Sequence, residues 1–405
     1  MPGPVACLAS RVNSDSRPLR TLAAAVAIGL TVVIAALGTV LWVRSLLSVT
    51  VPSLAGIPYS LGPCRPVADN VGFTGDPLLL GADVGASAEL GDGRIIWAYG
   101  DTFRRPDGVT LSAVRNSLVV EDDGCRAVVI PAGGQEAIPN REDGVGYWPM
   151  SLAVSVEGRA TVVRVFAERV RGSESRFGFV NLGPAVATFV VPSDGAPRLR
   201  SVVDLGPDDP SRRNVGWGAA VTSGGDGYLY IYGTANPEEP LVFGWSVRVA
   251  RARAADLDDP SAWDYWTGSG WDSDDSRAVE VISAVNGVSQ TFSVVEHGDS
   301  WYAVSKRDGD LGTDLAVWSA TAPWGPFSPP VTVGRIPNQE HPSLLRYMPL
   351  AHPEVPSESG TVAVSICRNS ADPALLLAAP EVYRPYFVSI ELPPRPSRRI
   401  LTASD

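Results

Sequence analysis

The feature that most constrains this chain is a hairpin pattern that occurs five times. Each copy has a short apolar strand, a polar turn that contains glycine, and a second strand rich in β-branched and aromatic residues, which is typical of a β-hairpin. The copies occupy residues 85–103, 151–170, 218–236, 291–309 and 352–370. Their turn glycines follow one another at intervals of 62 to 71 residues and are Gly93, Gly158, Gly227, Gly298 and Gly360.

A third strand-like run follows each hairpin, at residues 116–124, 185–195, 245–257, 314–327 and 384–394. A hairpin with a third strand, repeated at a regular interval, predicts the blades of a propeller around a central channel. A two-sheet sandwich needs a similar number of strands but does not explain the interval. We therefore expect an all-β fold, a five-bladed β-propeller over residues 60–396, with a tail at 397–405. Its closure should pair the N-terminal lead-in with the last blade.

Residues 21–43 form an uncharged apolar run of 23 residues, which is long enough to cross a membrane as a helix. Three arginines precede this run and only Arg44 follows it before Arg65, so the positive-inside rule predicts a cytoplasmic N-terminus. We expect residues 1–20 to be cytoplasmic, 21–43 to form an uncleaved transmembrane helix, and 44–59 to form a stalk. The predicted location is the plasma membrane, single-pass, with the propeller extracytoplasmic. A cleaved signal peptide is the alternative, although its apolar region is normally shorter.

The cysteines favour an oxidising compartment for the propeller. On this topology Cys64, Cys125 and Cys367 lie outside the membrane and Cys7 lies inside. Cys64 leads into the first predicted blade, and Cys125 lies in the outer strands of that blade. We therefore expect a disulfide between Cys64 and Cys125, and their spacing does not fit a zinc site.

One mouth of the predicted channel should collect polar side chains from every blade. In an antiparallel hairpin the start of the first strand and the end of the second lie at the same edge, so residues roughly ten before and eight after each turn glycine should meet there. From the first blade these are Asp83 and Asp101. The binding residues expected from the other blades are Trp148, Glu168, Arg169, Trp217, Asn236, Arg307 and His352.

These residue types suit a polyhydroxylated ligand. Aromatic rings stack on the apolar faces of sugars, and charged and amide groups bond the hydroxyls. The alternative for each of these residues is that it is only solvated, as polar residues at strand ends often are.

Asp83 and Asp101 each follow a strongly apolar run, in LLLGADVGAS and IIWAYGDTF. A carboxylate in such surroundings is partly desolvated, which raises its pKa unless a cation or a hydrogen-bond donor compensates. Glycoside hydrolysis requires two carboxyl groups, one to protonate the leaving oxygen and one to activate water or attack the sugar. The distance between neighbouring strands fits retaining and inverting enzymes alike, so it does not distinguish them.

Several segments resemble an actinobacterial family, the domain of unknown function 4185. The segments are GADVGASAELGDGRIIWAYGDTF, VGWGAAVTSGGDGYLYIYGT, VARARAADLDDPSAWDYWTGSGW, WSATAPWGPFS and the HPE at 352–354. The resemblance covers residues 60–395 and implies a five-bladed propeller similar to glycoside hydrolases of the endo-D-arabinanase type. Those enzymes act on mycobacterial cell-wall arabinan by inversion, and the resemblance assigns the catalytic aspartate pair to Asp83 and Asp101.

The chain departs from the resembled family at one position. Relatives often read Trp-Pro-Gly-Asp where this chain has Trp148, Pro149, Met150 and Ser151. The missing acid puts the activity and the specificity in question, and Glu168, on the same edge of the same blade, could replace it. The alternative to an enzyme is a propeller that binds an envelope glycan or an envelope protein without turnover.

Other functions find little support in the sequence. The net charge of -11 argues against a nucleic-acid partner. No G-x-S-x-G, P-loop or H-E-x-x-H pattern occurs, and three histidines are too few for a histidine-rich metal site. We expect no metal ligands and no cofactor, with a Ca²⁺ ion in the channel left open. The expected partners are an envelope polysaccharide and, through residues 21–43, the membrane. The oligomeric state is left open.

Overall fold

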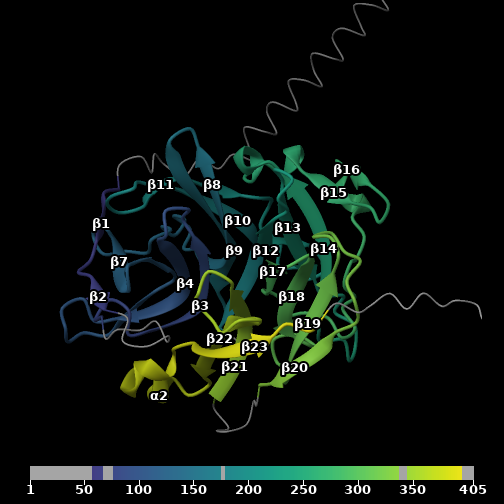
Figure 1. Cartoon of the computed structure of the whole chain (residues 1–405). Helices are drawn as coiled ribbons and strands as arrows, with labels where there is room; N and C mark the ends of the chain where they lie inside the picture. Colours follow the sequence, from purple (N-terminus) through teal and green to yellow (C-terminus); the bar gives the residue numbers. More distant parts are fainter. Residues whose placement is uncertain (1–56, 67–75, 175–177, 337–343, 395–405) are drawn as a thin grey trace, which may run out of the picture. The chain divides into compact units, whose positions relative to one another are not determined.

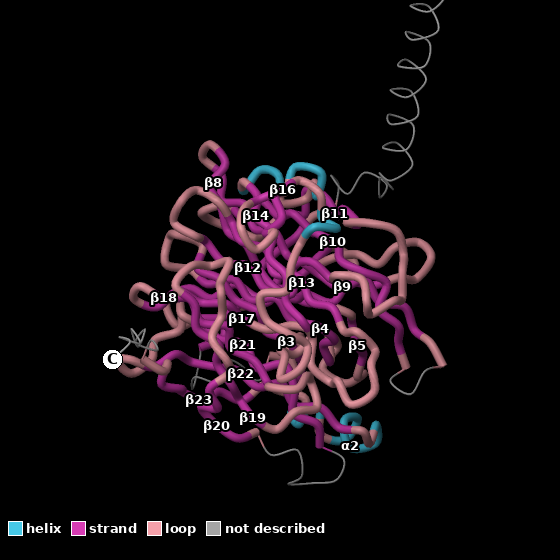
Figure 2. The backbone as a smooth tube through the Cα atoms, turned by 90° about the vertical axis from the view of Figure 1, so that its right-hand side faces the viewer, coloured by secondary structure: helices cyan, strands magenta, loops and turns pink. Residues whose placement is uncertain are grey.

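Strands dominate the part of the chain that the computed structural model describes, which comprises residues 57–66, 76–174, 178–336 and 344–394. The strands belong to the unit formed by residues 50–405. All five predicted hairpins are present, and each carries its third strand. Figure 2 shows strands through this unit and a few short helical turns.

The strands form five antiparallel sheets in the order of the sequence. The first sheet contains β1 (Tyr59–Leu61), β2 (Arg65–Pro66), β3 (Gly81–Glu89), β4 (Ile95–Arg104), β5 (Ser112–Val114), β6 (Ser117–Asp122) and β7 (Cys125–Pro131). The second contains β8 (Gly146–Glu157), β9 (Ala160–Gly172), β10 (Phe179–Val191) and β11 (Arg198–Asp204). The third contains β12 (Gly216–Ser223), β13 (Leu229–Ala235), β14 (Ser246–Ala252), β15 (Asp264–Trp266) and β16 (Trp271–Asp272).

The last two sheets have four and three strands. The fourth contains β17 (Ser293–His297), β18 (Ser300–Lys306), β19 (Asp314–Ala320) and β20 (Val331–Arg335). The fifth contains β21 (Leu344–His352), β22 (Thr361–Ser370) and β23 (Tyr386–Glu391). The short helical segments are η2 (Ala254–Asp256), η3 (Pro260–Ala262), η4 (Asp275–Arg277), α2 (Pro373–Ala378) and η5 (Pro380–Val382).

Each hairpin turns at a glycine in the left-handed region of backbone space. The φ angles are 90, 65, 83, 58 and 82° at Gly93, Gly158, Gly227, Gly298 and Gly360. Residues with a Cβ rarely adopt this conformation, so the repeated glycine has a direct structural cause.

The innermost strands of the five sheets form a ring around a central channel (Figure 1). Strand β3 lies beside β8, β8 beside β12, β12 beside β17, β17 beside β21, and β21 beside β3. Five clusters of buried apolar side chains fill the boundaries between successive sheets, one at each boundary. Burial of these faces stabilises the ring.

The predicted fold class, a five-bladed propeller preceded by a transmembrane helix, is wrong as stated. Propeller blades typically have four strands, and only four of the sheets reach this size, because the fifth has three strands. The predicted closure is also wrong, since β1 pairs with β7 of the first sheet, with Tyr59 opposite Pro131. The unit therefore has four complete blades and a three-stranded fifth sheet, because the N-terminal strand joins the first sheet instead of completing the last.

The predicted transmembrane helix at residues 21–43 lies outside the described residues, as do residues 1–20 and the tail at 397–405. In the ranges that are described, no helix is both long and apolar enough to cross a membrane. We correct the predictions of a single-pass helix and of a plasma-membrane location on this finding.

The N-terminal lead-in is also tied covalently to the first sheet. Cys64 and Cys125 form a disulfide, with their Cα atoms 5.5 Å apart. Pro66 on β2 pairs with Cys125 on β7, so the bridge joins the two segments where they already meet. Cys367 is a free, buried thiol that donates to the carbonyl of Val84 at 3.6 Å.

Candidate active site

Asp83 and Asp101 lie on the neighbouring strands β3 and β4, where the backbone is distorted. The pairing of these strands changes register between Ala82 and Val84, so Asp83 lies in a β-bulge. Val84 has a φ of 62°, which a β-branched residue rarely adopts. A Cβ on Gly100 would lie 2.3 Å from Asp83 Oδ1. Glycine is therefore needed at position 100 for the carboxyl group to lie against β4.

Hydrogen-bond donors from the fifth sheet and from β4 surround Asp83. The Tyr347 hydroxyl donates to Asp83 Oδ2 at 2.6 Å. The Tyr383 hydroxyl and the backbone N–H of Asp101 also donate to this carboxyl group. Burial raises the pKa of Asp83, and the donors oppose this rise because they stabilise the charged form.

Asp101 has fewer donors and a like charge beside it. Trp148 Nε1, on β8, donates to Asp101 Oδ1 at 2.9 Å. Burial raises the pKa of Asp101 to about 7, and the negative charge of Asp83 adds to the rise. The Trp148 ring also meets the Phe179 ring edge-on, with centroids 4.5 Å apart. Trp148 therefore holds Asp101 in place, while its stacking on a sugar stays a prediction.

A third carboxyl group, Glu168 on β9, lies directly opposite Trp148 in the strand pairing. It is buried, and it accepts hydrogen bonds from the Gly183 N–H, at 2.8 Å, and from the Gln290 side chain. Burial raises the pKa of Glu168 to about 7. Asn181 Nδ2 donates to Gln290 Oε1 at 3.1 Å and so orients the amide. Carboxyl groups of the first and second sheets thus lie around one tryptophan.

The two arginines predicted to bind ligand are held in ion pairs. Arg169 is buried, and its Nη1 lies 3.2 Å from Asp204 and 2.7 Å from Asp208. Its other N–H groups donate to the backbone carbonyls of residues 182, 183 and 207. Arg307 is half-buried and pairs with Asp314. These contacts hold Arg169 in the structure, and the predicted ligand roles of Arg169 and Arg307 both stay predictions.

Trp217 and Asn236, also predicted to bind ligand, are buried in structural contacts. The Trp217 ring packs between the second and third sheets, with its centroid 5.3 Å from that of Tyr265. Asn236 Nδ2 donates to the carbonyl of Gly244 at 2.8 Å. Alternate residues of a strand face opposite sides, and counting from a turn does not show which side faces the ligand. Both predicted roles stay predictions.

His352 lies at the other end of the inner strands from Asp83. It is the last residue of β21, whereas Tyr347, near the start of that strand, is the residue that reaches Asp83. The prediction counted back from Gly360, and the connection between β21 and β22 is longer than in the other hairpins. The count therefore ended at the wrong end of the strand and missed Tyr347.

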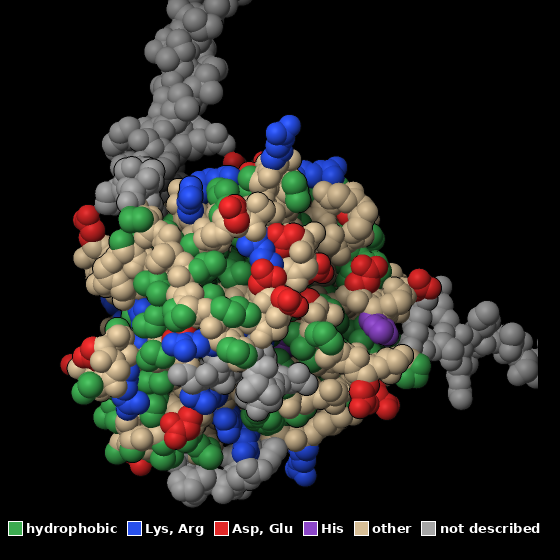
Figure 3. Space-filling model, turned by 60° about the vertical axis from the view of Figure 1, so that its left-hand side comes forward, with side chains coloured by type: hydrophobic (Ala, Val, Ile, Leu, Met, Phe, Trp, Pro, Cys, Tyr) green, Lys and Arg blue, Asp and Glu red, His purple; other side chains and the backbone are tan. Residues whose placement is uncertain are grey.

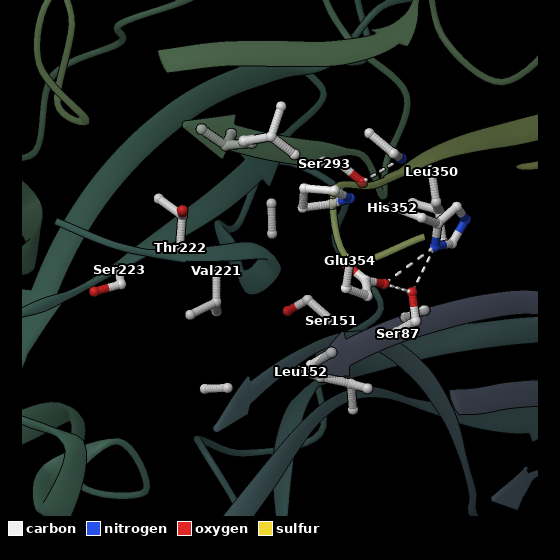
Figure 4. A pocket seen from close by; sticks show the side chains of 18 of the residues that line it. Ser87, Ser151, Leu152, Val221, Thr222, Ser223, Ser293, Leu350, His352 and Glu354 are labelled. Atoms are coloured by element: carbon white, nitrogen blue, oxygen red, sulfur yellow. Dashed lines mark hydrogen bonds and ion pairs between the residues drawn. The ribbon is translucent and has the colours of Figure 1, made fainter. Parts of the chain in front are cut away.

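The channel around His352 contains a cavity of about 450 Å³ lined by all five inner strands. His352 Nδ1 bonds Ser87 Oγ at 2.5 Å, its Nε2 bonds Ser365 Oγ at 2.7 Å, and Ser87 also bonds Glu354. Figure 4 shows Ser87, His352 and Glu354 together, with Ser151 and Ser293 near them and Thr222 and Ser223 farther away, on the other side of the cavity. Ser151, where the resembled family has an acid, donates to the carbonyl of Gly218 at 2.7 Å and lines this cavity.

Metal ligands do not cluster in the described part of the chain, where no group of three or more His, Cys, Asp and Glu side chains could hold an ion. Whether the protein uses a cofactor, or binds Ca²⁺ in its channel, stays a prediction.

Comparisons with known proteins identify a family and a fold. The family described as Domain of unknown function (DUF5005) matches residues 73–392. This is not the family that the sequence motifs resemble. No curated protein matches the chain.

Among solved structures, a Bacteroides ovatus protein provisionally described as a hydrolase shares 20% identity and a TM-score of 0.62. The match covers 82% of this chain and 93% of that one. An inulosucrase from Halalkalicoccus jeotgali bound to kestose shares 16% identity with a TM-score of 0.49. That match covers 84% of this chain and 92% of the inulosucrase chain. An α-L-arabinanase from Cellvibrio cellulosa shares 11% identity with a TM-score of 0.42. That match covers 78% of this chain and 93% of the arabinanase chain. The first match shows the fold alone, and TM-scores below 0.5 are too low to support an argument.

Proposed function

The chain belongs to the family described as Domain of unknown function (DUF5005), and we propose that this member is a glycoside hydrolase. The observation that carries the proposal is the pair Asp83 and Asp101. Both carboxyl groups are half-buried on neighbouring strands, and their hydrogen-bond surroundings differ. Acid–base hydrolysis of a glycoside needs two carboxyl groups with different pKa values, so that one is protonated while the other is charged.

The surroundings support one assignment of roles. Asp101 has the Trp148 indole as its donor and lies beside the charge of Asp83, so Asp101 is the group that keeps a proton. Asp83 accepts hydrogen bonds from Tyr347 and Tyr383, which favour its charged form. In the proposed reaction Asp101 gives its proton to the glycosidic oxygen as the bond to the sugar carbon breaks. Asp83 takes a proton from the water that attacks that carbon from the opposite face, which inverts its configuration.

Glu168 is proposed to bind substrate beside this pair. It is buried opposite Trp148, and at a pKa of about 7 it carries a proton for much of the time near neutral pH. A protonated carboxyl group can donate a hydrogen bond to a sugar hydroxyl, which a carboxylate cannot do. The absence of an acid at Ser151 bears less on catalysis than the sequence suggested, because Ser151 lines the channel cavity.

The proposed substrate is a furanosidic arabinan of a cell envelope, cleaved at internal bonds. The support for this substrate is the resemblance of the motifs around Asp83 and Asp101 to the endo-D-arabinanase type. An envelope polysaccharide is accordingly the proposed partner.

The test is incubation of the purified chain with arabinogalactan, beside the variants Asp83→Asn and Asp101→Asn. Release of oligosaccharides by the wild type, reduced at least ~10²-fold in each variant, is expected, since general acid–base catalysis typically contributes this much or more. Asp299→Asn, at an exposed residue in the turn between β17 and β18, is the matched control and should keep full activity. Binding of arabinogalactan without release, unchanged in both variants, would instead support a propeller that binds glycan without turnover.

A further inference from the structure

Three arginines lie in a row across the fifth sheet. Arg346 on β21 is directly opposite Arg368 on β22 in the strand pairing. Arg368 Nε donates to the backbone carbonyl of Arg384, just before β23, at 2.8 Å. The guanidinium carbons of Arg346 and Arg368 lie 5.9 and 5.8 Å from the centre of the Tyr386 ring. The row therefore concentrates arginine side chains at one end of the sheet.

The electrostatics of the cluster are strongly cationic. Burial lowers the pKa of Arg368, and the charge of Arg346 acts in the same direction. Burial also lowers the pKa of Arg384. The negative charge of Glu381 opposes this decrease, and the positive charge of Arg368 adds to it. A fourth cation, Lys306, donates to the backbone carbonyl of Arg346. The chain as a whole is acidic, with a net charge of -11, and on the face in Figure 3 acidic and basic side chains are interspersed.

The row of arginines adjoins the aspartate site. Each arginine is the neighbour in sequence of a residue of that site, in the pairs Arg346–Tyr347, Arg368–Asn369 and Tyr383–Arg384. Tyr347 and Tyr383 donate to Asp83, and Asn369 Nδ2 donates to the Tyr347 hydroxyl at 3.5 Å. Successive side chains of a strand point to opposite faces, so Arg346 and Arg368 lie at the same end of the sheet as Tyr347 but on its other face, while Arg384 Nε donates to the carbonyl of Leu80 at 2.6 Å. A polysaccharide bound at Asp83 would bring its neighbouring sugars close to them.

Arg368 is the best placed of the three to bind a ligand. It is half-buried, and its Nε is used for the carbonyl of Arg384. Its terminal nitrogens make no hydrogen bond or ion pair with any residue in the described ranges. A guanidinium presents a planar fork of N–H groups that matches the oxygens of a carboxylate or a phosphate.

We propose that Arg346, Arg368 and Arg384 form a subsite for an anionic substituent of the polysaccharide, a carboxylate or a phosphate group. This inference rests on the proposed function, because it names the class of polysaccharide that the hydrolase prefers. The anion fixes the sugar that carries it beside the reacting bond.

The first arm of the test measures hydrolysis. The full chain is assayed on an arabinan preparation that carries carboxylate and phosphate groups, and on the same preparation after carboxyl reduction or after dephosphorylation. Removal of the recognised anion should lower kcat/KM about 10- to 100-fold, mainly through KM, as expected for loss of a charge-assisted hydrogen bond. Arg368→Gln should show the low value on every preparation, and the exposed control Arg198→Gln should behave as the wild type. The treatment that lowers activity tells a carboxylate from a phosphate.

The second arm measures binding without catalysis. The Asp101→Asn chain is titrated with sodium glucuronate and with inorganic phosphate at constant ionic strength, alone and combined with Arg368→Gln, Arg368→Lys or Arg198→Gln. One of the two anions should bind to the Asp101→Asn chain. Its affinity should be at least tenfold lower with Arg368→Gln. The decrease should be smaller with Arg368→Lys, because lysine keeps the positive charge but lacks the planar fork of N–H groups. Circular dichroism and denaturant unfolding establish that each variant is folded.

The two arms separate the two proposals. Anion binding that depends on Arg368, in a chain that hydrolyses no preparation, overturns the hydrolase and leaves the subsite standing. Equal hydrolysis of all preparations, with anion binding absent or indifferent to Arg368, overturns the subsite and leaves the hydrolase standing.

Discussion

The substitution Asp101→Asn should abolish activity and, above pH 7, make the protein more stable. Asp101 is half-buried beside the like-charged Asp83, so its ionisation is costly in the folded chain. Asparagine has the same shape and keeps an oxygen for the Trp148 indole, which donates to Oδ1 at 2.9 Å. The substitution therefore removes the charge without removing the hydrogen bond.

The size of the effect follows from the pKa of Asp101, which burial raises from 3.8 to about 7. Below pH 4 both the folded and the unfolded chain hold the proton, so the group has no effect on stability. Between pH 4 and pH 7 the folded chain binds more protons than the unfolded chain, and the free energy of unfolding falls as pH rises. The free energy of unfolding falls by about 1.4 kcal/mol for each of about three pH units, which gives about 4 kcal/mol in all. Because Asp101 is only half-buried, solvent screening reduces this loss to about 2–4 kcal/mol.

The assay is urea unfolding of the wild type, Asp101→Asn and the control Asp299→Asn at pH 5 and pH 8. We expect Asp101→Asn to gain about 2–4 kcal/mol over the wild type at pH 8 and much less at pH 5, while Asp299→Asn follows the wild type at both. An equal difference at the two pH values, or no gain at pH 8, would refute the reasoning that Asp101 is held protonated by its surroundings.

Three other substitutions test the site. Tyr347→Phe removes a donor to the charged form of Asp83, so the acidic limb of the pH–rate profile should move to higher pH, and an unmoved limb would contradict the role of Asp83 as base. Gly100→Ala places a Cβ 2.3 Å from Asp83 Oδ1, so kcat on arabinogalactan should fall at least about tenfold by displacement of a catalytic group while circular dichroism shows a folded chain. Unchanged kcat would show that the carboxyl group need not lie against β4. Arg169→Met breaks a buried ion pair with Asp204, so the free energy of unfolding should fall by about 3–5 kcal/mol. A normal stability with weaker substrate binding would instead support the ligand role predicted for Arg169.

The local structure of this protein could be predicted from its sequence because it depends on residues that are close in the chain. A glycine between two strand-like runs specifies a hairpin, and all five turn glycines have positive φ angles. Asp83 and Asp101 were predicted to lie on adjacent strands because they flank one such turn, and the structure has them on β3 and β4. The pairing of Cys64 with Cys125 was predictable for the same reason, since both belong to one sheet.

What meets across the boundary between two sheets was decided only by the tertiary structure. Tyr347 reaches Asp83 from a strand 264 residues away, while His352, five residues further along that strand, lies in the channel cavity. Trp217 was expected at the mouth and is buried instead, because neighbouring positions on a strand face opposite sides. A hairpin is specified by its own turn, but the alignment of one sheet with the next depends on bulges, connection lengths and side-chain packing that no local pattern in the sequence encodes.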